Sequence, residues 1–186
     1  MIYNWKKIVK TSMPLLTLCT LVEIVAGQLL QSWESVLLLF PLFLVSIPVI
    51  NGVGGNIGSV LGARIASGLH VGSISISLKD RRTREAFLTA VIIGVLSYVL
   101  LGVILYYFAH FFLDLKDGVV FSHYILVIFG AGLLLVFTLC LASVFTAFWS
   151  FKKGYDPDDF VAPVVTTIGD VFGILFLLLF LSLIVL

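Results

Sequence analysis

An all-helical membrane protein is the fold class that this sequence predicts, and three observations predict it. Of the 186 residues, 61% are hydrophobic and only 11% are charged, whereas soluble domains contain about 25% charged residues. The apolar residues form continuous runs, which do not alternate with polar ones as the strands of a membrane barrel do. Each run is also long enough for the helix of about 20 residues that crosses a hydrocarbon core.

Five apolar runs are predicted to be membrane-spanning helices, at about 12–32, 36–69, 84–113, 119–150 and 160–186. They should be helical because backbone groups in lipid can be satisfied only within the chain. The first run is too long for a signal peptide and ends without a small-residue cleavage site. We therefore expect a single multi-pass domain over residues 1–186, embedded in the lipid of the cell membrane, with no soluble regulatory domain.

The basic residues predict how these helices are oriented. If the five helices alternate in direction, ten of the eleven Lys and Arg residues fall on one side, and only Lys116 falls on the other. Because cytoplasmic loops collect Lys and Arg, the N-terminus is predicted inside and the C-terminus outside. The outer loops are mildly acidic, with Glu34, Asp114 and Asp117. The net charge of +1 leaves no basic face for nucleic acid.

The second run is longer than a simple span needs. Its 34 residues, 36–69, would extend about 50 Å as one helix. Pro41, Pro48 and the glycine-rich stretch 51–58 are expected to kink it. Irregular backbone at membrane depth is tolerated only inside protein or beside a water-filled cavity. This run is therefore a first indication of a permeation path.

Asp170 is the most informative single residue. It lies about eleven residues into the fifth predicted helix, or roughly 16 Å along it, which is near the bilayer midplane. A carboxylate at that depth is costly and usually marks an ion or proton pathway. Thr166 and Thr167 precede it by one turn and lie near the same face. The alternative is a protonated, structural Asp170 that is hydrogen-bonded to a neighbouring helix.

Three further polar residues are predicted to contribute to a cation site. Asn56, in the glycine-rich stretch, is expected to line the pore, and Ser59 follows it on a nearby face. Glu23 is a second acid within a membrane helix and is a functional candidate for that reason. Glu23 could instead pair with a polar side chain, and the glycines around Asn56 could serve only close helix packing.

The available ligands favour a hard cation. The sequence contains no P-loop, hydrolase triad or HExxH motif, so we do not expect an enzyme. Carboxylate, amide and hydroxyl oxygens suit Mg²⁺ or Ca²⁺. One Asp per chain holds a divalent ion weakly, whereas two copies facing each other would supply two charges. Cys19 and Cys140 lie far apart in apolar runs and are predicted to be buried thiols.

At these residues the chain resembles the membrane domain of MgtE-type magnesium transporters and related eukaryotic solute carriers. Residues 54–59 match the stretch Gly-Gly-Asn-x-Gly-Thr/Ser of that family. Residues 163–173 follow the more specific pattern Pro-x-x-Thr-Thr-x-x-Asp-x-x-Gly. Helix number, order and predicted orientation agree as well, so the resemblance covers essentially the whole chain.

The resemblance implies a homodimer with a pore along its two-fold axis. It implies that Asp170 holds a hydrated Mg²⁺ ion in mid-membrane and that Asn56 lies on the same path. The chain departs from the family in having Val60 where bacterial members commonly have Gln. It also lacks the soluble magnesium-sensing and CBS domains of those members, so gating through such domains is not expected.

These observations predict transmembrane transport of divalent cations, principally Mg²⁺, through a homodimer with paired Asp170 residues. One alternative is a divalent cation exchanger coupled to Na⁺ or H⁺, with Glu23 as a second titrating site. Another class is a membrane subunit or scaffold that transports nothing, in which Asp170 is only a structural acceptor.

Overall fold

Five long helices make up most of the part of the chain that the structure describes, as the sequence predicts. The structure, a computed structural model, describes residues 5–113 and 118–185. Its helices are α1 (Trp5–Ser32), α2 (Glu34–Leu39), α3 (Pro41–His70), α4 (Arg81–Phe112), α5 (Phe121–Lys152) and α6 (Pro157–Ile184). All but the short α2 are long and apolar enough to cross a membrane. The chain is therefore an all-α, multi-pass integral membrane protein.

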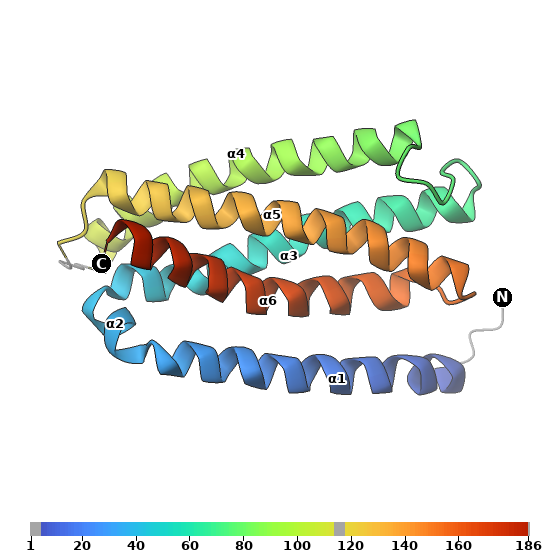
Figure 1. The fold of residues 1–186 in the computed structure, drawn as a ribbon, viewed down its shortest axis with the longest axis horizontal. Coiled ribbons are helices and arrows are strands. Elements are labelled where there is room, and N and C mark those ends of the chain that lie inside the picture. Colours follow the sequence, from blue (N-terminus) through green and yellow to red (C-terminus); the bar gives the residue numbers. More distant parts are fainter. Residues whose placement is uncertain (1–4, 114–117, 186) are drawn as a thin grey trace.

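The long helices alternate in direction, so successive connections lie at opposite ends of the bundle (Figure 1). The start of α1, the loop 71–80 and the loop 153–156 share one end, which gathers the basic residues of these segments. The alternating directions of the five long helices agree with the assumption from which the orientation was predicted. That the basic end faces the cytoplasm remains a prediction. The outer-loop residues Asp114, Lys116 and Asp117 lie outside the described residues.

The second predicted run is divided beside Pro41, one of the positions expected to kink it, and not at Pro48 or the glycine-rich stretch. The chain breaks at Phe40 (φ −126°, ψ 69°), between α2 and α3. Pro41 is the first residue of α3, a position where its missing N–H costs no hydrogen bond. The glycine-rich stretch 51–58, expected to kink, is continuous helix within α3. The prediction of irregular backbone there was wrong.

The glycines of α3 serve close helix packing instead. A Cβ added at Gly58 would overlap Val165 of α6, and one added at Gly62 would overlap Val161. The small residues thus let the backbones of α3 and α6 approach, as in small-xxx-small contacts of membrane helices. From α5, the Ser143 hydroxyl donates a hydrogen bond of 2.6 Å to the Gly58 carbonyl. These contacts fix the register of α3 against α6.

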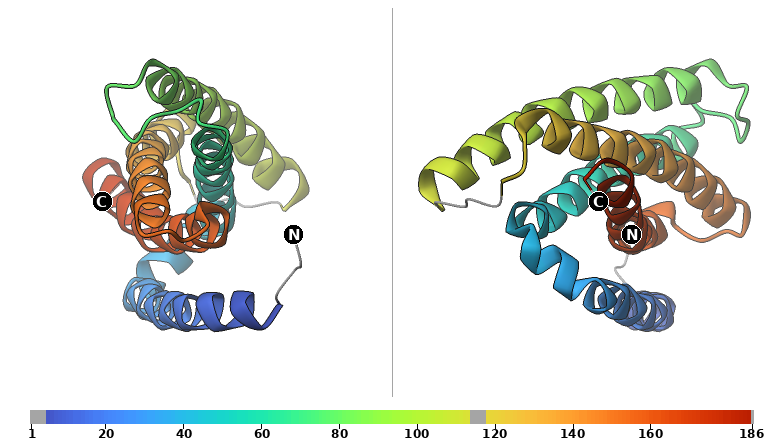
Figure 2. Two further views of the ribbon diagram at one scale, coloured as in Figure 1. Left: turned by 90° about the vertical axis from the view of Figure 1, so that its right-hand side faces the viewer. Right: turned by 60° about the vertical axis from the view of Figure 1, so that its left-hand side comes forward.

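Helices α3, α5 and α6 pack against one another at the centre of the bundle, and α4 covers α3 and α5. Among the described residues, helix α1 packs along α6 and meets α2, and its backbone does not closely approach that of α3, α4 or α5. Viewed from the end, α1 lies apart from the other long helices (Figure 2). Part of α6 is therefore flanked by α1 on one side and by α3 on the other.

The α3–α4 loop ends in a cap formed by Asp80. Its carboxylate accepts hydrogen bonds from the Ser75 backbone N–H (3.1 Å) and hydroxyl (2.8 Å). It also accepts from the backbone N–H groups of Arg82 and Thr83, at the start of α4. The bonds from Ser75, with smaller contributions from Thr83 and Arg82, lower the pKa of Asp80 from 3.8 to about 2.

This lowered pKa predicts a pH-dependent contribution to stability. The folded state binds the Asp80 proton less readily than the unfolded chain does, so the contribution is complete above pH 3.8 and is lost as the pH falls to about 2. We expect Asp80→Ala to lower the melting temperature in detergent at pH 6, and the difference from wild type to shrink through that window. A difference that persists undiminished at pH 2 would contradict the assignment.

Candidate functional site

Asp170 lies at the middle of α6, with 12 residues between it and Pro157 at one end and 13 between it and Ile184 at the other. Its side chain is half-buried. The amide of Asn51, on α3, donates a hydrogen bond of 3.2 Å to Asp170 Oδ1. The same Nδ2 lies 3.4 Å from the Asp170 backbone carbonyl oxygen. The acid at the centre of the bundle is therefore tied to α3.

Sequence reasoning missed Asn51 as a site residue. It belongs to the glycine-rich stretch, five positions before Asn56, and was considered only as part of a helix-breaking segment. The available signal was its type, since an amide within a membrane helix requires a polar partner. That its partner is Asp170 followed only from the packing of α3 on α6.

Glu23 and Thr167 lie together on the other side of α6. The Thr167 hydroxyl, which is buried, donates a hydrogen bond of 3.2 Å to Glu23 Oε1 of α1. Thr167 precedes Asp170 by three residues, so Glu23 contacts α6 about one helical turn from Asp170. The α1–α6 contact thus brings together three of the predicted residues, Glu23, Thr167 and Asp170.

A cavity of about 400 Å³ opens between α1 and α6 beside this group. Its lining residues are Leu16, Cys19, Thr20, Glu23, Ala162, Pro163, Thr166 and Thr167. Thr166 is exposed, one turn before Asp170, and its hydroxyl donates to the Ala162 (2.9 Å) and Pro163 (3.1 Å) carbonyls of its own helix. Its oxygen lone pairs therefore remain available to a ligand.

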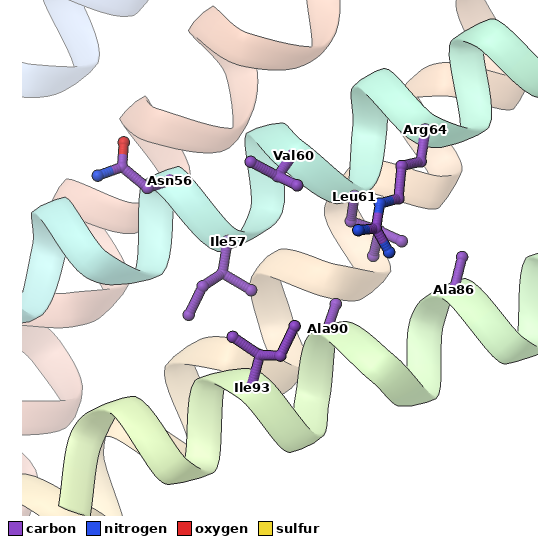
Figure 3. A pocket seen from close by; sticks show the side chains of 8 residues that line it. All are labelled: Asn56, Ile57, Val60, Leu61, Arg64, Ala86, Ala90 and Ile93. Carbon is purple, nitrogen blue, oxygen red and sulfur yellow. The ribbon is translucent and has the colours of Figure 1, made fainter. Parts of the chain in front are cut away.

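Asn56 and Ser59 lie on α3, away from the Asn51–Asp170 contact. The Asn56 side chain is exposed and Ser59 is half-buried. Asn56 is at the end of a cavity of about 170 Å³ between α3 and α4, which Arg64 also lines. Figure 3 shows the Asn56 amide directed away from α4. No contact among the described residues joins Asn56 or Ser59 to Asp170, so their place in the site remains a prediction.

Contact between α3 and α6 nevertheless brings the polar positions of the two helices near one another. A Cβ added at Gly55 would lie 3.3 Å from Thr166 Cγ2, so Thr166 sits directly beside α3 at the residue before Asn56. Asn56 and Thr166 are both exposed. One copy of the chain thus presents amide and hydroxyl groups outward, about one helical turn from Asp170 along α6.

The chemistry offered here is that of oxygen ligands. Among residues 5–113 and 118–185, no three His, Cys, Asp or Glu side chains gather closely enough to hold a metal ion. Cys19 and Cys140 are buried free thiols, as predicted. A cation at Asp170 would therefore be held by a carboxylate, neighbouring hydroxyl or amide groups, water, or groups from a second copy.

The bundle and its polar centre define a class: a multi-pass membrane protein with acidic and amide groups between helices at mid-span. The chain belongs to the MgtE family, whose description is "Divalent cation transporter" and whose match covers residues 47–180. It is also similar to proteins called solute carrier family 41 member 2. The one from Homo sapiens is 31% identical over 144 residues, which is 68% of this chain and 24% of that protein.

The corresponding proteins of Gallus gallus and Mus musculus are each 29% identical over 136 residues, with the same coverage of 68% and 24%. The chain thus spans about a quarter of the length of these curated relatives. The region of likeness includes α6 through Phe180 and so contains Asp170.

Proposed function

We propose that this chain transports divalent cations, principally Mg²⁺, across the membrane, and that Asp170 is the cation ligand at mid-span. The observation that supports this most is a half-buried carboxylate midway along α6, with one oxygen bonded to Asn51. A carboxylate at that depth is expensive unless it serves an ion pathway. The family's description as divalent cation transporters supports the same function.

Two copies of the chain complete the proposed site. A single copy offers Asp170 with nearby Glu23, and its outward polar groups, Asn56 and Thr166, would otherwise face hydrocarbon. A partner related by a two-fold axis would cover these groups and bring a second Asp170 to the same ion. Mg²⁺ keeps several of its waters and binds directly to few carboxylates, which suits two acids separated by a hydrated ion.

Coupled exchange is a second candidate, and one contact favours it. Glu23 accepts a hydrogen bond from Thr167 and lies near Asp170. A second acid beside the cation site could take up H⁺ or Na⁺ as the divalent ion leaves. In that case, Mg²⁺ flux would follow an imposed Na⁺ or pH gradient, and Glu23→Gln would remove this dependence while passive Mg²⁺ movement remained.

The test is transport by the purified chain. Proteoliposomes that contain a Mg²⁺-sensitive dye should show influx above that of protein-free liposomes, and millimolar Mg²⁺ should raise the melting temperature of the detergent-solubilised protein. Cross-linking in the same liposomes should give a dimer. A chain that gives neither flux nor stabilisation by Mg²⁺ would instead be a structural membrane subunit.

A further inference from the structure

The Asn51 side chain is held tightly between two features of α6. On one side, its Nδ2 reaches both Oδ1 (3.2 Å) and the backbone carbonyl (3.4 Å) of Asp170. On the other side, its Oδ1 rests on Gly173, where an added Cβ would overlap that oxygen. Gly173 thus provides the space that the Asn51 amide occupies. The amide bridges two positions of α6 one turn apart.

The direction of the amide follows from its neighbours. Asn51 Oδ1 is buried and accepts no hydrogen bond from the described residues. Turning the amide over would place this oxygen against the oxygens of Asp170, where acceptors repel, and would leave Nδ2 at Gly173. An ionised Asp170 therefore selects the orientation in which Asn51 donates.

The main chain beneath Asn51 is fixed as well. The Tyr98 hydroxyl of α4, which is buried, donates a hydrogen bond of 2.7 Å to the carbonyl of Ile50, the preceding residue. Asn51 therefore has little freedom to follow Asp170 if that side chain turns. The contact constrains the carboxylate more than it constrains the amide.

We propose that Asn51 is a positioning residue that makes the Asp170 carboxylate a one-oxygen ligand and so favours Mg²⁺ over Ca²⁺. This inference rests on the proposed function of Asp170. With Oδ1 engaged by the amide, Oδ2 is left to face the cation or its water. Mg²⁺ accepts such single-oxygen contacts and keeps its water shell, whereas Ca²⁺ takes six to eight oxygens and readily binds both oxygens of one carboxylate.

Removal of the amide donor should therefore relax selectivity. In Asn51→Leu, which preserves the approximate size, both oxygens of Asp170 become free to approach one ion. A hydrogen bond to a charged group is strong enough to change a binding ratio by about tenfold. We expect the ratio of Ca²⁺ to Mg²⁺ affinities to rise about tenfold, with the change in transport appearing in KM more than in the maximal rate.

Gly173→Ala provides an independent variant, because it keeps Asn51 and Asp170 but fills the space of the amide. It should shift selectivity in the same direction. Gly169→Ala is its matched control on the same helix, since its added Cβ would meet Leu139 at 3.4 Å and the Asn51 backbone oxygen at 4.0 Å, both ordinary contact distances that leave the Asn51 amide in place. Ser143→Ala removes a buried hydrogen bond to α3 at a distance from Asp170 and controls for a general loss of packing.

The measurements are thermal stabilisation of the purified protein by MgCl₂ or CaCl₂ titration and the corresponding ion fluxes in liposomes. Asn51→Ala, which is smaller than the native residue, replaces Asn51→Leu if the leucine variant does not fold. The inference would be overturned if the Asn51 and Gly173 variants had a lower melting temperature but an unchanged ratio of Ca²⁺ to Mg²⁺ affinities. If wild type itself neither binds nor transports Mg²⁺, the proposed function fails first, and the two failures are thereby distinguished.

Discussion

Asp170→Asn is expected to reduce Mg²⁺ flux in proteoliposomes to the level of protein-free liposomes. The substitution preserves the shape of the side chain and its contact with Asn51, while it removes the charge that attracts the ion. In a dimer, each variant pair loses both α6 carboxylates at the proposed site, and Glu23 of α1, which is bonded to Thr167, is left as the acid nearby. Neutral oxygen ligands do not displace the waters of Mg²⁺, and they attract the hydrated ion too weakly to hold it.

Asp159→Asn is the matched control for this prediction. Asp159 lies in the first turn of the same helix, where an acid interacts favourably with the helix dipole and not with an ion at mid-span. Its substitution should leave most of the flux intact. If Asp170→Asn transports Mg²⁺ as fast as wild type at equal protein content in the liposomes, the site has been placed wrongly and Asp170 is a structural acid.

Gly58→Ala is expected to have the largest effect on folding. An added Cβ there would overlap Val165, and it would also lie 3.2 Å from Ser143 Oγ and 3.3 Å from Leu139 Cβ. These neighbours belong to two helices, α5 and α6, so no single side-chain movement relieves the crowding. Overpacking of this kind costs about 1–3 kcal/mol, and the melting temperature in detergent should fall by several degrees.

Gly27→Ala is the comparison within another long helix. Apart from the neighbouring backbone of its own helix, no described atom lies within 4 Å of a Cβ added at Gly27 of α1, so the substitution should gain about 0.5–1 kcal/mol of helix propensity. The two variants should therefore shift the melting temperature in opposite directions. Equal effects at both positions would mean that α3 and α6 do not pack through their small residues.

The number and approximate ends of the membrane helices were predictable from the sequence because they depend on local composition. An apolar run of sufficient length has only the helix available in lipid. Asp170 could be singled out for a related reason, since a charge far from both ends of such a run is costly wherever the run packs. The glycine-rich stretch of the second run was wrongly expected to kink because glycines weaken an isolated helix, whereas in the bundle they permit contacts that stabilise it.

The sequence by itself therefore determined the membrane class, the five spans and an acidic position at mid-span, all of which follow from the transfer of single residues between water and lipid. Only the tertiary structure decided which polar groups meet. The packing of α3 on α6 pairs Asp170 with Asn51, and the packing of α1 pairs Glu23 with Thr167. These pairs depend on the rotation and register of whole helices, which small-residue contacts such as Gly58–Val165 fix and which no local pattern along the chain encodes.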